Sequence, residues 1–249
     1  MVWSYSRLTA FEDCPYQWLC HYIYHEDSER RFFADYGKFM HKLLGGYFLG
    51  ELNKSELKTK YLTAFQTEVV GKAPSSSVFE NYFQQGANYL PNVGSFMDKD
   101  SYKIIGVEDK FDFQIDKFEF VGYVDLLIEC EGGLIIVDHK SGALKPTSGR
   151  KIPTAYDTAR EAKLRQLYLY AEAVKQRYGE YPKKLLFNCF RTSQVIEEDF
   201  SEKKLAASQI WATSTIDAIS KEGDWRPEVN LFKCKYICDL IDCPYRAFI

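Results

Sequence analysis

Residues 108–140 read EDKFDFQIDKFEFVGYVDLLIECEGGLIIVDHK, and this stretch decides the fold of the chain. Together with the residues just before it, the stretch predicts three consecutive strands, at 103–115, 118–129 and 134–140. Val, Ile, Phe and Tyr dominate these segments, as a pleated and buried surface prefers. Because the links between them are so short, neighbouring strands should pair as hairpins.

The first link, Asp116-Lys117, fits a two-residue hairpin loop. Paired positions in that hairpin have residue numbers that sum to 233, which sets Glu108 directly opposite Asp125. Directly opposed residues have Cβ atoms about 4.5–5.5 Å apart. An acidic pair is therefore predicted within one hairpin, on strands that are otherwise mainly apolar.

The second link permits two registers if its loop also has two residues. A loop at 131–132 sets Asp125 opposite Asp138, whereas a loop at 132–133 sets Asp125 opposite Lys140. Either register leaves the three side chains on one face, because side chains alternate with period 2. A loop of three residues would put them on opposite faces.

Acidic groups gathered on an apolar sheet repel one another and lose hydration. A divalent cation resolves that conflict, since carboxylate oxygens bind Mg²⁺ at about 2.0–2.1 Å. The stretch thus predicts a metal site with Lys140 beside it. The alternative interpretation is that Asp138 and Lys140 only form the polar end of a strand.

The composition is typical of a globular protein, and the length of 249 residues is enough for one large domain or two small ones. A net charge of −3 gives no global attraction to nucleic acid, so a polyanionic partner must be met by local patches. Seven basic residues between 140 and 165 form the best candidate for a phosphate-backbone surface. A solvated charged loop is the alternative.

Cysteine usage and hydropathy predict the compartment. Seven cysteines, an odd number, argue against a secreted disulfide framework. The N-terminal segment lacks the pattern of a signal peptide, and no apolar run approaches the roughly 20 residues of a membrane span. We therefore expect a reducing, cytoplasmic location and no membrane partner.

Around the three strands, apolar periodicity predicts mainly helices. A helix at 5–25 contains Pro15, which should kink it. The helix at 36–49 contains His41, which in isolation favours a core or surface histidine over a ligand. A long loop at 141–159 precedes a helix on which Gln166 and Tyr170 share a face. The remaining predicted elements are helices at 51–69, 77–91, 160–178 and 202–221 and strands at 184–190 and 194–198.

The C-terminal tail places Cys234, Cys238 and Cys243 within ten residues. In a cytosolic protein such a cluster suggests metal ligation, and a fourth thiolate would complete the set. Cys14 and Cys20 are the candidates for that fourth ligand. Buried small apolar residues are the alternative interpretation of these cysteines.

In their order and spacing, these segments resemble the PD-(D/E)XK nuclease superfamily. The most similar branch is the RecB-like one, with AddB-type nuclease domains and CRISPR-associated exonucleases. The resemblance covers nearly the whole chain. It is carried by Ser4-Tyr-Ser-Arg-Leu, Cys14-Pro15, Gly37-Lys-Phe-Met-His41, Gly122-Tyr-Val-Asp125, Val137-Asp138-His-Lys140-Ser-Gly142, Gln166-x-x-x-Tyr170 and the cysteine tail.

The resemblance implies an α/β fold with a restriction-endonuclease-like core, in which helices flank a mixed central sheet. The chain would be a single nuclease domain over 1–249. It would have an N-terminal helical part at 1–100, the nuclease core at 101–200, and a helix with the cysteine-rich tail at 201–249.

The resemblance also assigns roles to residues. Mg²⁺ or Mn²⁺ would be bound by His41, Asp125 and Asp138, assisted by the backbone carbonyl of His139. Lys140 would be the catalytic lysine. Gln166 and Tyr170 would help position DNA and the active site, and Glu108 matches an acidic position of the family.

Cys14, Cys234, Cys238 and Cys243 would hold a [4Fe–4S] cluster. The tail has the spacing C-x3-C-x4-C, whereas the family has C-x2-C-x5-C, so zinc or an empty site is the alternative. Val124 stands where the superfamily's name has proline.

The implied function is a metal-dependent DNA nuclease, an exonuclease on single strands or DNA ends that leaves 5′-phosphates. Such enzymes act in recombination, repair or CRISPR adaptation, with DNA and a helicase or a recombination or CRISPR protein as partners. The alternative is a catalytically inactive nucleic-acid-binding scaffold stapled by a metal or an iron–sulfur cluster.

Overall fold

The computed structural model describes residues 1–97 and 101–248. Within them, five strands form one sheet in the order β1-β2-β3-β4-β5. Only β3 and β4 pair in parallel, and the other neighbours are antiparallel. The strands are β1 Tyr102–Ile115, β2 Phe118–Cys130, β3 Gly133–His139, β4 Lys184–Cys189 and β5 Gln194–Asp199.

Both predicted hairpins are confirmed. Ile115 pairs with Phe118, so residues 116–117 form the first loop, as predicted. Cys130 pairs with Gly133, so the second loop is 131–132 and the register is the one that sets Asp125 against Asp138. The ladder between β2 and β3 ends at Leu126–Val137, one residue before those two carboxylates.

One face of the sheet is covered by α3 Phe32–Phe48, α4 Lys54–Glu68 and α5 Ser76–Tyr89, followed by the 3₁₀-helix η2 Leu90–Asn92. Their core is rich in aromatic rings. Helix α3 begins four residues before the predicted start at 36, because Phe32 is itself a buried core residue.

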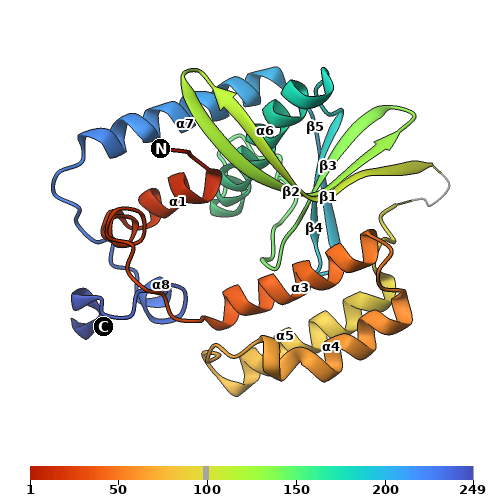
Figure 1. Cartoon of the computed structure of the whole chain (residues 1–249), viewed down its shortest axis with the longest axis horizontal. Coiled ribbons are helices and arrows are strands. Elements are labelled where there is room, and N and C mark those ends of the chain that lie inside the picture. The colour runs from red at the N-terminus through yellow and green to blue at the C-terminus, as the bar shows by residue number, and fades with distance from the viewer. Residues whose placement is uncertain (98–100, 249) are drawn as a thin grey trace.

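The other face is covered by α1 Tyr5–Asp13, α6 Ala155–Tyr178 and α7 Glu202–Lys221. Figure 1 shows the layers, with α3, α4 and α5 on one side of the sheet and α6 and α7 on the other. Together these confirm the predicted α/β fold with a mixed sheet between helices. Helix α6 joins β3 to β4, as a parallel pair requires a crossover.

The prediction of a single helix at 5–25 is wrong. The chain leaves the helical conformation at Cys14, which has φ −168° and ψ 105°, and restarts as α2 Pro15–Leu19. Pro15 occupies the first turn of α2, where a proline costs no hydrogen bond. A π-helical turn, η1 Cys20–Tyr24, follows.

Helix α6 begins five residues before the predicted start at 160. Thr154 and Asp157 form a capping box in which each side chain accepts from the other residue's backbone N–H. The Gly-, Ser- and Pro-rich composition upstream favoured a loop in the prediction. The observed loop before α6 is therefore shorter than the one predicted at 141–159.

The tail returns to the N-terminal segment through α8 Leu231–Tyr236 and the 3₁₀-helix η3 Pro244–Phe248. Ser28 and Leu240 form an isolated bridge, and Asp239 accepts from Gln17 and His21. Segments more than 200 residues apart in sequence therefore lie together.

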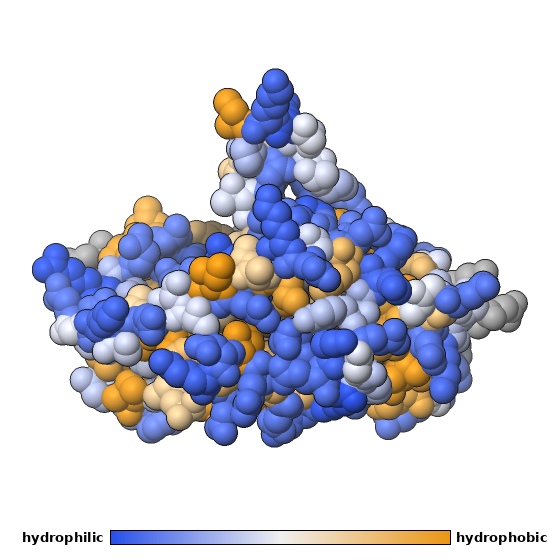
Figure 2. All heavy atoms as spheres, turned by 90° about the horizontal axis from the view of Figure 1, so that it is seen from above, coloured by the Kyte–Doolittle hydropathy of each residue, from blue (hydrophilic) through white to orange (hydrophobic). Residues whose placement is uncertain are grey.

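Figure 2 shows a largely hydrophilic surface, with apolar residues in small separate groups and one narrow projection. Across the described ranges, no helix has both the length and the apolar character needed to span a bilayer.

Candidate active site

The carboxylate of Asp125 lies where β2 and β3 stop pairing. Its Oδ2 accepts a hydrogen bond of 2.6 Å from the backbone N–H of His139. The side chain thus takes the place of a ladder carbonyl and remains 8% exposed. This contact fixes the carboxylate at the end of β3.

His41 reaches this carboxylate from α3. Its Nε2–H donates to the backbone carbonyl of His139 at 2.9 Å, while Nδ1 lies 3.4 Å from Glu108 Oε1 and 3.5 Å from Asp125 Oδ1. One ligand atom from each of His41, Glu108 and Asp125 lies within 4.8 Å of the other two. These three residues form the candidate metal group. In this arrangement the carbonyl of His139 orients His41.

Glu108 has a left-handed backbone with φ 50°. The ladder continues on both sides of it, with Val107 opposite Leu126 and Asp109 opposite Val124, so the predicted count across the hairpin holds. Alternation along β1 is interrupted here. Val107 packs with the α3 core and Phe111 with the α6 core, although regular alternation would put both on one face. The irregular conformation lets Glu108 face His41.

Asp138 and Lys140 lie on the α6 side of the sheet. Lys140 Nζ is 2.7 Å from Asp138 Oδ2 and donates to Gln166 Oε1 at 2.8 Å. Gln166 Nε2 in turn donates to the Tyr170 hydroxyl at 2.9 Å. The structure therefore joins four predicted site residues in one polar chain.

Charge coupling links the two groups. Burial acts to lower the pKa of His41, but the hydrogen bonds and charges of Asp125 and Glu108 outweigh it and raise that pKa to about 10. Burial acts to raise the pKa of Asp125, and His41 reverses the shift, so this pKa is lowered. Burial raises the pKa of Asp138 to about 6, with Lys140 opposing and the charge of Asp125 adding to the rise. Asp125 and Asp138 thus repel each other, and a bound cation would relieve this repulsion.

The ring of His139 is structural. It is 2% exposed, stacks on Phe48 at 5.6 Å, and its Nδ1 accepts from Asn188 Nδ2 at 3.0 Å. Burial lowers its pKa to about 4, so the imidazole is neutral.

Asn188 and Arg191 also belong to the site, although neither was predicted from the sequence. The carbonyl of Asn188 accepts from Lys140 N at 2.9 Å, and Arg191 Nε donates to the carbonyl of Ser141 at 2.8 Å. Both therefore hold the backbone on either side of the Lys140 side chain. The available signal was a polar residue, Asn188, within the otherwise mainly apolar strand predicted at 184–190.

A groove of about 610 Å³ opens onto the candidate metal group along α3. His41 and Glu108 line it, together with Lys38, Lys42 and Gly45. A β-carbon on Gly45 would lie 3.4 Å from Glu108 Cγ, so α3 packs closely against the Glu108 side chain at this glycine.

Four cysteines line one pocket between the tail and α1: Cys14, Cys234, Cys238 and Cys243. All four are free thiols, and burial raises the pKa of Cys238. No three of these sulfurs lie within 4.8 Å of one another in the described part of the chain. Tetrahedral zinc with Zn–S bonds of 2.3 Å would need sulfurs about 3.8 Å apart. In this arrangement the sulfurs therefore do not form a ready tetrahedral zinc site.

The predicted basic surface at 140–165 is only partly exposed. Lys145, Arg150 and Lys151 face solvent, whereas Arg160 is 5% exposed and pairs with Glu198 and Glu161. That arginine belongs to an internal network because α6 packs it against β5.

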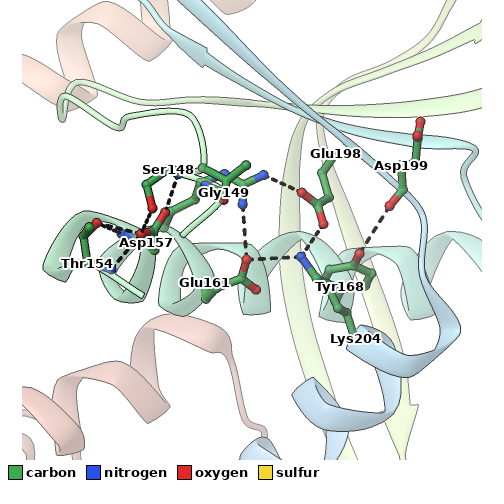
Figure 3. A network of polar contacts seen from close by, with 11 residues as sticks. Ser148, Gly149, Thr154, Asp157, Glu161, Tyr168, Glu198, Asp199 and Lys204 are labelled. Atoms are coloured by element: carbon green, nitrogen blue, oxygen red, sulfur yellow. Dashed lines mark hydrogen bonds and ion pairs between the residues drawn. The ribbon is translucent and has the colours of Figure 1, made fainter. Parts of the chain in front are cut away.

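Figure 3 shows this network, with Glu161 and Glu198 meeting Lys204 of α7. At its other end Asp157 accepts from Ser148 and Thr154. Hydrogen bonds from Ser148 and Thr154 lower the pKa of Asp157, so its carboxylate is charged and fixes the loop before α6.

Comparison with known proteins gave one family and a structural likeness. The sequence profile described as "PD-(D/E)XK nuclease superfamily" matches residues 2–248. No curated protein matches the chain. A crystal structure from Eubacterium rectale, described as "Putative exonuclease", is similar with a TM-score of 0.55 and 11% identity, over 97% of this chain and 90% of that one. The crystal structure of SSO0001 has a TM-score of 0.32 and 15% identity, over 84% of this chain and 96% of that one.

Proposed function

The chain belongs to the PD-(D/E)XK nuclease superfamily, and from this premise we propose that it is a metal-dependent deoxyribonuclease. It hydrolyses phosphodiesters to leave 5′-phosphates, and it acts as an exonuclease on single strands or DNA ends. The observation that carries the proposal is the metal group of His41, Glu108 and Asp125 beside the pair of Asp138 and Lys140. The whole of 1–249 acts as one nuclease domain.

Two carboxylates and one imidazole suit Mg²⁺ or Mn²⁺. The buried Asp138 interacts electrostatically with Asp125. Such an ion, when bound, acidifies water and neutralises charge on the phosphoryl group. The chain's own residues do the remaining work. Asp125 and His41 supply ligand atoms. The carbonyl of His139 accepts from the Nε2–H of His41 and so holds the imidazole in its orientation.

Lys140 supplies the positive charge for the reaction. Its ammonium is shared between Asp138 and Gln166, which holds it at the mouth of the site. There it orients the attacking water or stabilises the negative charge that develops on the phosphate. Tyr170 keeps Gln166 in the orientation that accepts from Lys140.

The four pocket cysteines would hold a structural [4Fe–4S] cluster, with zinc as the alternative. The cluster would clip α2 to the tail, and its loss should loosen that end of the fold. Recombination, repair or CRISPR adaptation are the settings in which such a nuclease would work with a helicase or another protein.

The test is digestion of end-labelled oligonucleotides with Mg²⁺, with Mn²⁺ or with EDTA. Wild type should cleave only with metal, and Asp138→Ala and Lys140→Ala should abolish cleavage while DNA binding survives. Lys60→Ala on α4, an exposed lysine that is not among the residues of the candidate site, is the charge-matched control. Full activity in either site variant refutes the assignment, and binding without any cleavage by wild type indicates an inactive scaffold.

A further inference from the structure

Lys163 has no role in the site described above, although it lies on the face of α6 that carries Gln166 and Tyr170. It precedes Gln166 by three residues and Tyr170 by seven, which places all three on one side of the helix. Gln166 binds the ammonium of Lys140. Lys163 is therefore about 4.5 Å further along the helix axis, next to the mouth of the candidate site.

The other basic side chains of α6 are already engaged. Arg160 pairs with Glu198, Arg165 pairs with Glu12, Lys175 donates to the carbonyl of Gly179, and Arg177 donates to the carbonyl of Lys110. Lys163 is exposed and has no hydrogen bond or ion pair within 1–97 and 101–248. It is thus the cation of this helix that is left for a ligand.

The groups that face Lys163 come from three other elements. Lys140 and Asp138 act on it from the β3 end, Asp13 from α1, and Lys233 from α8. Asp13 is itself paired with Lys233. Partial desolvation lowers the pKa of Lys163, and repulsion from the ammonium of Lys140 lowers it further. An anion between them would relieve that repulsion.

We propose that Lys163 binds a phosphate of the DNA strand next to the scissile one, on the side of the site that leads to the cysteine tail. This proposal rests on the proposed nuclease function and names a contact with its substrate. A single nucleic-acid strand fits the position, because successive phosphates present a negative charge to each ammonium in turn. Lys163 is then a positioning residue, which holds the strand while Lys140 faces the reacting phosphate.

The first test is binding of a labelled single-stranded oligonucleotide, with Ca²⁺ in place of Mg²⁺ or Mn²⁺ so that cleavage is held back. Lys163→Gln should raise Kd about 3–10-fold and reduce the slope of log K against log salt by about 0.7, as loss of one phosphate contact predicts. Lys163→Arg should keep both values, and Lys60→Gln is the control for loss of a surface charge. An unchanged salt slope in Lys163→Gln overturns the proposal.

The second test compares cleavage of the oligonucleotide with cleavage of a dinucleotide, which has only the scissile phosphodiester. Lys163→Gln should lower kcat/KM for the oligonucleotide about 3–10-fold through KM and leave the dinucleotide unaffected. An equal fall for both substrates would mean that the residue acts only through the fold, and would overturn the proposal. If wild type cleaves neither substrate, the nuclease assignment fails and the binding test still decides the role of Lys163.

Discussion

Asp125 and His139 are joined by a hydrogen bond of 2.6 Å, in which the backbone N–H of His139 donates to Oδ2 of Asp125. The bond stands where the β2–β3 ladder has ended, so a side chain replaces a backbone acceptor. The other oxygen, Oδ1, is left facing His41. One residue thus closes the sheet and presents a charged ligand atom.

Asp125→Asn should separate these two tasks. The amide oxygen can still accept from His139, but the charge that binds the metal is lost. We expect Mn²⁺-dependent cleavage to fall at least about 10²-fold, as for loss of a metal ligand or a key electrostatic group. Asp125→Ala should be less stable than Asp125→Asn by about 1–3 kcal/mol, because it leaves the buried N–H of His139 without an acceptor. Urea unfolding in EDTA measures the difference, and equal stability of the two variants would contradict it.

Gln166→Leu should slow the reaction without weakening the metal site. Lys140 then loses its neutral acceptor and retains only Asp138, which draws the ammonium away from the mouth of the site. We expect kcat to fall about 10–100-fold, with Mn²⁺ affinity within about twofold of wild type. Tyr170→Phe removes only the acceptor of Gln166 and should show a smaller fall in the same direction. Steady-state kinetics and metal titration check both, and a large loss of Mn²⁺ affinity in Gln166→Leu would show a different role.

Asp138→Asn should stabilise the metal-free protein, and more so at pH 8 than at pH 5. The pKa of Asp138 is about 6 when folded, against 3.8 as the ordinary value. A raised folded pKa means that wild type is most favoured below pH 3.8 and loses stability as pH rises through 6. The variant cannot ionise, so its gain over wild type should be about 3 kcal/mol at pH 8 and roughly half of that at pH 5. Urea unfolding in EDTA at the two pH values tests this. A gain that is larger at pH 5 than at pH 8 would have the wrong sign.

Cys14→Ser should lower iron content and thermal stability together. Cys14 is the pocket cysteine from the N-terminal side, while the other three come from the tail, so its loss should release the tail. Cys130→Ser is the control, because Cys130 lies at the end of β2, where its thiol donates to the carbonyl of Gly133. Anaerobic purification, the visible spectrum and metal analysis provide the readouts. A colourless wild type with stoichiometric zinc would replace the iron–sulfur assignment.

Asp157→Ala should free the loop before α6. The side chain accepts from Ser148 and Thr154, and the exposed Arg150 and Lys151 lie between them. Without these contacts the loop opens locally, and trypsin should cleave after Arg150 and Lys151 faster than in wild type. Asp217→Ala on α7 is the control, since that carboxylate is exposed and belongs to another helix. Equal cleavage rates in the two variants would show that the capping box does not hold the loop.

Local pattern predicted the sheet well. Alternation with period 2 and two short links predicted the three strands and both hairpins, which the structure confirms. The β2–β3 ladder ends at Leu126–Val137, so Asp125 and Asp138 follow it without pairing. The residues could not choose between loop tips 131–132 and 132–133, because both satisfy the same alternation. The helix break at Cys14 and the early start of α6 were missed, since composition masked each local cap.

The sequence by itself determined which strands pair and which charges they bring together, because those contacts are local and follow from side-chain alternation. Only the tertiary structure decided that His41 joins Glu108 and Asp125, that Lys163 stands free beside Lys140, and that Cys14 meets a tail over 200 residues away. The physical reason is that α3 and α6 reach the site from opposite faces of the sheet. Their placement depends on the packing of two separate cores, which no short stretch of sequence contains.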